Sequence, residues 1–159
     1  GLRRIIIVLP FLTLIEQTAR IYRKIFEDFG ESFVLEAHSL SGASDEQGSR
    51  NKLLAENWDA PIVITTNVKF FESLHHNRPS VCRKLHRIAG AVVLCDEVQS
   101  LPTSVQLPHS IAQTVSKEER EQGANLIVPT LATITSLVRE FKTTVVFATA
   151  TQPAFDNTL

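Results

Sequence analysis

The segment from Val92 to Gln99 joins an apolar run to side chains that can do chemistry. The run ends in the adjacent carboxylates of Asp96 and Glu97, and Gln99 follows two positions later. Side chains just past the carboxyl end of a strand in a parallel α/β sheet line the ligand crevice. At such a place Asp96 can hold Mg²⁺ through a water, and Glu97 can orient or deprotonate an attacking water. The pattern predicts phosphoryl transfer; the alternative is a buried strand followed by a solvated turn.

A second apolar run, Val145 to Ala148, ends in two hydroxyl residues, Thr149 and Thr151, with one small residue between them. Hydroxyls at this strand end could hydrogen-bond to Glu97 or Gln99 and sense what is bound there. The alternative is a threonine-rich strand end, since β-branched residues favour strands. Together, the two strand ends resemble motifs II and III of superfamily 2 helicases.

Two strand-to-helix junctions are expected at the same edge of the sheet. Free amides at a helix start, with hydroxyls beside them, can grip a phosphate of a nucleotide or of a nucleic-acid backbone. Ordinary helix capping is the alternative: Thr13 and Glu16 have the spacing of a capping box, and Asn67 can cap the next helix. In superfamily 2 helicases the matching places, motifs Ia and Ib, touch single-stranded backbone, which favours nucleic acid. The candidate residues are Pro10, Phe11, Thr13, Thr65, Thr66 and Asn67.

Composition places the chain among ordinary soluble domains. Its 159 residues fit one domain, and a net charge of −1 gives no global positive field, so any nucleic-acid contact must be local. The longest apolar run, Ile5 to Leu9, is too short to span a membrane. The two cysteines match neither a disulfide framework nor a metal site, which favours a reducing, cytoplasmic setting. The absence of methionine, with Gly1 opening on a strand, predicts an internal cut of a longer protein.

Strand and helix patterns alternate along the chain. Because the strand patterns are mostly continuous apolar runs, they predict a parallel sheet covered on both faces. A helix after Pro10 is expected to bury Ile15, Ala19, Tyr22, Phe26 and Phe29, and the last helix Ile127, Leu131, Ile134, Val138 and Phe141. The expected strands are 4–9, 33–37, 62–66, 91–95 and 144–148. Residues 1–159 are therefore read as one α/β domain, a RecA-like three-layer sandwich with a mainly parallel sheet.

A local basic cluster lies between the third and fourth expected strands. It can track phosphates or be a solvated helix face, and the sequence does not choose between them. The cluster consists of Arg78, Arg83, Lys84, His86 and Arg87.

The joint pattern resembles one family more closely than helicases at large. The segments that carry the resemblance are Ile5–Phe11, Glu16–Thr18, Thr65–Leu74, Asn77–Ser80, Cys82–His86, Asp96–Glu97 with Gln99, Leu101–Pro102 and Thr149–Pro153. They are similar to the CRISPR-associated helicase-nuclease of type I interference systems, over nearly the whole chain.

This resemblance implies an ATP- and Mg²⁺-dependent enzyme of antiviral defence, recruited to a guide-RNA surveillance complex, that moves along single-stranded DNA. It implies that Asp96 serves Mg²⁺ and Glu97 the hydrolytic water. Gln99, Thr149 and Thr151 would couple the nucleotide state to DNA grip, and Pro10, Phe11, Thr65, Thr66 and Asn67 would lie on the DNA path.

Three parts of that family's pattern are absent from the 159 residues. No Gly-Lys-Ser or Gly-Lys-Thr phosphate loop occurs, and neither the second RecA-like domain nor the HD nuclease domain is present. The chain is thus expected to be a partial motor lobe, with motifs Ia, Ib, II and III but without the first strand and phosphate loop. The alternative is a non-enzymatic RecA-like module that binds nucleic acid or a partner protein.

Overall fold

The computed structural model of the chain describes residues 3–37, 54, 57–75, 83–97, 104–105, 124–125 and 127–149. Two predicted site residues, Gln99 and Thr151, lie outside this part. So does Arg78 of the basic cluster.

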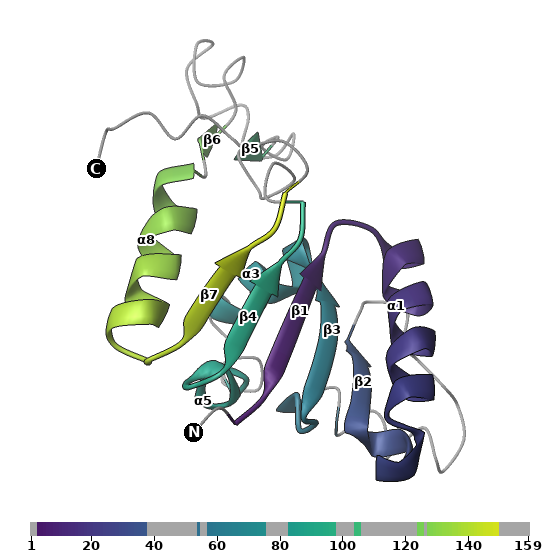
Figure 1. Ribbon diagram of the computed structural model, residues 1–159. Coiled ribbons are helices and arrows are strands. Elements are labelled where there is room, and N and C mark those ends of the chain that lie inside the picture. The colour runs from purple at the N-terminus through teal and green to yellow at the C-terminus, as the bar shows by residue number, and fades with distance from the viewer. Residues whose placement is uncertain are drawn as a thin grey trace.

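A five-stranded, all-parallel sheet forms the centre of the described fold (Figure 1). Its spatial order is β2-β3-β1-β4-β7, so β1 is central and β7 is an edge strand of the described sheet. The strands are β1 (Ile5–Leu9), β2 (Val34–Ala37), β3 (Ile62–Thr66), β4 (Val92–Cys95) and β7 (Thr144–Phe147). Each matches an apolar run predicted as a strand, with bounds that differ by at most one residue.

Helices cover both faces of this sheet. Helix α1 (Leu12–Ile25) packs on one face, and α3 (Asn67–His75), α5 (Leu85–Ile88) and α8 (Ile127–Arg139) lie on the other, as Figure 1 shows. Two short 3₁₀ turns, η1 (Glu27–Phe29) and η2 (Glu31–Phe33), lead from α1 into β2. A separate antiparallel pair joins β5 (Ser104–Val105) to β6 (Ala124–Asn125). The predicted α/β class is confirmed, and the arrangement is consistent with a RecA-like fold.

Alternation along each strand divides the apolar side chains into two cores. The larger core lies under α3 and α8 and includes Val8, Val63 and Val93. The smaller lies under α1 and includes Ile7 and Ile64. Both faces of the central strands are therefore buried, which explains why β1 and β3 read as continuous apolar runs.

The predicted helix caps are partly wrong. Thr13 is the second residue of α1, whose N-cap is Phe11 with no side-chain cap hydrogen bond, so Thr13 and Glu16 form no capping box. At α3 the Oγ1 of Thr66 accepts a hydrogen bond of 3.0 Å from the Lys69 amide. Thr66 therefore caps this helix and Asn67 begins it, because the helix starts directly at the end of the strand.

Two predicted helix faces are also corrected. Phe29 lies beyond α1 in η1 and is exposed, although its ring still lies 4.9 Å from that of Phe33, between centroids. In the last helix Leu137 is buried in place of Val138, which is exposed, while Phe141, beyond the end of α8, still packs against the larger core as expected. Phe29 and Phe141 lie outside the helices because each helix ends earlier than its apolar pattern.

The basic cluster meets a buried tryptophan at the amino-terminal edge of the sheet. Lys84 is buried, with its ammonium 5.3 Å from the centre of the Trp58 ring, and Arg87 forms a 2.8 Å ion pair with Asp59. Asp59 also lies 3.9 Å from Arg4. Burial, and then the nearby Arg87, lower the pKa of Arg4. Lys84 is therefore not on a solvated helix face, one of the two alternatives for the cluster, because it packs against Trp58, while Arg87 pairs with Asp59.

Candidate functional site

The carboxyl ends of the parallel strands gather the predicted chemistry at one edge. Register places Cys95 of β4 between Val8 of β1 and Phe147 of β7. Asp96 and Glu97 follow β4 directly, Thr149 comes two residues after β7, and Pro10 follows β1. Residues from three neighbouring strands thus leave the sheet side by side, as the parallel topology requires.

Asp96 is held in place by one hydrogen bond from its backbone amide and one to its side-chain carboxylate. Its amide donates to the Val8 carbonyl at 3.0 Å, which extends the ladder one residue beyond β4. Its Oδ1 accepts a 3.0 Å hydrogen bond from the Glu97 amide. The Asp96 residue is only partly buried, so this carboxylate stands at the sheet edge in a defined orientation and remains in reach of solvent.

Glu97 has a left-handed backbone, with φ of 52°. This region is uncommon for any residue other than glycine and costs a non-glycine residue about 1–2 kcal/mol. Conformations of this kind cluster at functional sites, where the surroundings hold them in place. The strained turn bends the chain immediately after the strand and leaves the Glu97 side chain at the edge rather than in the core.

Thr149 approaches the same place from the neighbouring strand. The Ala148 amide donates a 2.8 Å hydrogen bond to the Cys95 carbonyl, which holds the end of β7 against the end of β4. Thr149 is partly buried. The structure thus brings it to the edge that Asp96 and Glu97 occupy, whereas Gln99, the other predicted partner, and Thr151, the second hydroxyl, lie outside the described residues.

The oxygen ligands at this edge are better suited to a Mg²⁺ ion that also binds waters and a phosphate than to a metal bound only by protein side chains. Among the described residues there is no group of three or more histidine, cysteine, aspartate or glutamate side chains that could hold a metal. Mg²⁺ prefers one or two carboxylates, several waters and phosphate oxygens. Asp96, with Oδ1 engaged by the Glu97 amide, fits such a water-mediated contact.

The junction after β1 exposes an aromatic ring. Phe11, the N-cap residue of α1, is 63 % exposed, Thr13 is exposed and Pro10 is partly buried. Since α1 has no side-chain cap, its first amides face this edge without a side-chain acceptor at the cap position. An exposed ring beside such amides can stack on a base while the amides face a phosphate.

The junction after β3 is more buried than the sequence predicts. Thr65 is 0 % exposed and its hydroxyl donates a 2.7 Å hydrogen bond to the Ala37 carbonyl, so this side chain ties β3 to β2. Asn67 is buried as well. Of the three residues predicted to contact DNA here, only Thr66 presents its side chain partly to solvent. Alternation along the strand is the cause, because Thr65 points to the covered face.

Cys95 packs inside the larger core. Burial raises the pKa of its thiol to about 12. A thiol with such a pKa remains protonated near neutral pH and is a poor nucleophile. Cys95 therefore supports the strand end beneath Asp96 and takes no chemical part.

Fold and site together define an α/β protein whose parallel sheet presents two acids and a threonine at its carboxyl edge. No protein-family model matches the chain. The chain is 29% identical, over 169 aligned positions, to the CRISPR-associated nuclease/helicase Cas3 of Haloferax volcanii. The alignment covers 95% of this chain and 16% of that protein, so the chain spans about a sixth of the length of its relative. The similarity supports a Cas3-related origin. Within the described residues, no helix is long and apolar enough to cross a membrane.

Proposed function

We propose that this chain is part of the motor of an ATP-dependent translocase or helicase that acts on single-stranded DNA in CRISPR antiviral defence. The observation that carries the proposal is the placement of Asp96 and Glu97 at the carboxyl end of a central parallel strand, with Thr149 ending the next strand. The similarity to the Haloferax protein supports the same reading.

In this proposal the two acids divide the work of hydrolysis. Asp96 holds Mg²⁺ through water, and Mg²⁺ neutralises charge on the β- and γ-phosphates of ATP. Glu97 orients the attacking water and takes its proton. The hydrogen bond from the Glu97 backbone amide to Oδ1 of Asp96 orients the Asp96 carboxylate against the backbone that carries Glu97.

In this proposal, residues at the ends of neighbouring β-strands couple ATP hydrolysis to DNA binding. Thr149, Thr151 and Gln99 connect the edge of the sheet that binds the nucleotide to the surface that binds single-stranded DNA. Pro10, Phe11, Thr13 and Thr66 line that surface. Backbone contacts of this kind fix the position of a strand without reading its sequence, as a translocase requires.

The proposed ATP hydrolysis requires structural elements that these 159 residues do not contain. A phosphate loop would supply the amides and the lysine that hold the β- and γ-phosphates, and no Gly-Lys-Ser or Gly-Lys-Thr occurs here. We propose that a longer protein provides it, together with a second RecA-like domain and an HD nuclease domain. A guide-RNA surveillance complex is the proposed partner and the cytoplasm the proposed location.

A non-enzymatic RecA-like module that binds nucleic acid or a partner protein is the second candidate, and it would use the exposed Phe11 and the partly exposed Thr66 without any hydrolysis. The two are separated by the ATPase activity of the full-length product of the gene, measured with and without single-stranded DNA. The motor reading expects DNA-stimulated hydrolysis that Asp96→Asn reduces on the order of a hundredfold, while Asp28→Asn, on an exposed turn, leaves it unchanged. A wild-type protein with no hydrolysis would favour the module.

A further inference from the structure

The segment between Glu72 and Asp96 carries an excess of positive charge. It contains no aspartate or glutamate, whereas it has four arginine and lysine residues and three histidines. The whole chain has a net charge of −1, so this excess is local. Because a local excess of one sign attracts partners of the opposite sign, an anionic partner is expected where the fold exposes this segment.

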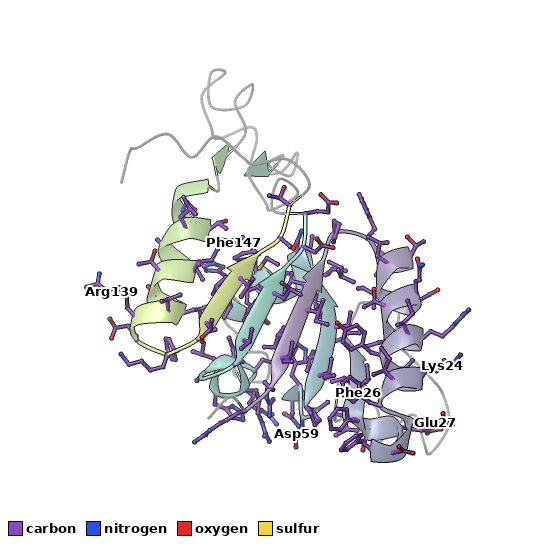
Figure 2. All side chains as sticks on the ribbon, in the orientation of Figure 1. Lys24, Phe26, Glu27, Asp59, Arg139 and Phe147 are labelled. Carbon is purple, nitrogen blue, oxygen red and sulfur yellow. The ribbon has the colours of Figure 1, made fainter. Side chains whose placement is uncertain are left out.

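The fold exposes part of this segment at the edge of the sheet where the parallel strands begin. Figure 2 shows Asp59 at this edge, and Arg87 of α5 forms its 2.8 Å ion pair with Oδ1 of that carboxylate. Arg4, directly before β1, lies 3.9 Å from the same oxygen. Arg4 and Pro10 lie on either side of β1, so at about 3.3 Å per residue the two edges of the sheet are roughly 20 Å apart. This edge is therefore separate from the proposed nucleotide site.

Asp59 neutralises the positive charge at this edge only in part. One carboxylate faces two guanidiniums, and burial, followed by the proximity of Arg87, lowers the pKa of Arg4. Asp59 engages Nη1 of Arg87, whose Nε makes no hydrogen bond. The Arg87 side chain is 33 % exposed, and a guanidinium has five N–H donors. Arg87 can therefore donate to a further anionic acceptor on the solvent side.

Two exposed basic side chains lie close to Arg87 along the chain. His86 is its neighbour in α5, and Arg83 lies shortly before that helix. Neither forms an ion pair with another residue of the described part. Exposed basic groups of this kind bind phosphates, because each contact releases counterions that are condensed on nucleic acid. We call Arg83, His86 and Arg87 the basic edge.

The other end of the same edge is acidic. Glu27 and Asp28 in η1 and Glu31 in η2 are all exposed. Figure 2 shows Glu27 at the foot of α1, away from Asp59. Since these carboxylates repel a polyanion, a nucleic-acid strand at this end of the sheet would be confined to the half that carries the basic edge.

We propose that the basic edge binds the phosphate backbone of nucleic acid, in addition to the contact proposed at Phe11 and Thr66 on the opposite edge of the sheet. Phosphate contacts carry no sequence information, so this surface would hold a strand of any sequence. The choice of nucleic acid over an acidic protein segment rests on the proposed function, which the similarity to a nuclease/helicase supports. The contact itself requires no ATP hydrolysis.

Chemical modification of arginines in the full-length gene product tests the assignment without any substitution. p-Hydroxyphenylglyoxal reacts with exposed guanidiniums, and mass spectrometry measures the modification of each arginine separately. The protein is modified alone, with an oligothymidine strand, and with polyglutamate of the same total charge, all in the absence of nucleotide. The control is Arg139, whose side chain points away from α8 in Figure 2.

Arg83 should react in the free protein, lose most of its reactivity with oligothymidine and keep it with polyglutamate, whereas Arg139 should react alike in all three samples. An Arg83 that is unreactive in the free protein, is not protected by oligothymidine, or is protected equally by polyglutamate would overturn the proposal. The ATPase activity of the same preparation is measured in parallel. A protein that hydrolyses no ATP but shows a protected Arg83 would lose the motor assignment and keep this contact.

A salt titration of oligothymidine binding gives a second measurement. Arg83→Gln removes one charge from the basic edge, and Lys24→Gln removes one from an exposed position on α1 as the matched control. For single strands the logarithm of the binding constant falls with the logarithm of the salt concentration, with a slope of about −0.7 per phosphate contact. Arg83→Gln should make this slope shallower by about that amount, and Lys24→Gln should leave it unchanged. Circular dichroism checks that both variants fold, and equal slopes for Arg83→Gln and the wild type would contradict the proposal.

Discussion

The amide of Ala148 donates a 2.8 Å hydrogen bond to the carbonyl of Cys95. This bond joins the last residue of β4 to the residue that follows β7, so the segments after the two parallel strands begin from adjacent points. Asp96 and Glu97 leave one strand and Thr149 leaves the other. A change at the acidic pair can therefore reach the threonine without passing through the core, as the proposed coupling requires.

Thr65 and Thr66 should differ sharply when each is replaced. Thr65→Val removes a buried hydroxyl that bonds to the Ala37 carbonyl, and should cost about 1–3 kcal/mol of stability. Thr66→Ala removes a helix cap and should cost about 1 kcal/mol. Urea unfolding of the full-length protein measures both costs.

The two substitutions should rank the other way in their effect on DNA binding, with the larger loss of affinity at Thr66. Thr66→Ala should weaken single-stranded DNA binding with little dependence on sequence, whereas Thr65→Val should leave the affinity of the folded protein unchanged. An equal loss from both variants in a salt titration would mean that the junction acts only through stability.

Phe11 should contribute to DNA binding through its ring. Base–aromatic stacking is worth about 1–3 kcal/mol per base, so Phe11→Leu should weaken binding to an oligothymidine strand by roughly 5- to 150-fold, and Phe11→Trp should keep it. On an abasic strand of equal length the variants and the wild type should bind alike. A loss that persists on the abasic strand would assign Phe11 to helix packing instead.

Much of this edge could be predicted because strand ends are readable from sequence. The apolar runs before Asp96 and Thr149 fixed their places at one edge of a parallel sheet. The fate of Thr65 could not be predicted in the same way, since whether a strand-end residue faces the core or solvent depends on which face a helix covers. The left-handed turn at Glu97 has no sequence signal, because glycine or asparagine would normally mark it.

The isolated 159-residue chain should show no ATPase, bind Mg-ATP only weakly and self-associate. In the described sheet β7 is an edge strand, and the apolar side chains of Ile5 and Val146 are exposed, both of which promote association. Val146→Lys should lower the mass measured by light scattering, and Val68→Lys, at a more exposed apolar site on α3, should not. A monomeric wild-type chain that binds ATP in the micromolar range would contradict this prediction.

Coupling should be separable from hydrolysis. Thr149→Ala combined with Thr151→Ala should leave the basal ATPase of the full-length protein partly intact and abolish directional strand displacement. Thr135→Ala, on the exposed side of α8, serves as the matched control. Both activities are measured on one preparation, and a parallel loss of the two would point to catalysis or misfolding rather than coupling.

The most direct test of the motor account is Glu97→Gln in the full-length protein, with ATP binding and ATP hydrolysis measured side by side. If Glu97 positions the water, this variant should bind Mg-ATP as the wild type does. Its rate of hydrolysis should fall by about a hundredfold or more. Glu140→Gln, at an exposed position after α8, should match the wild type in both measurements. Hydrolysis by Glu97→Gln close to the wild-type rate would contradict the catalytic role of this strand end.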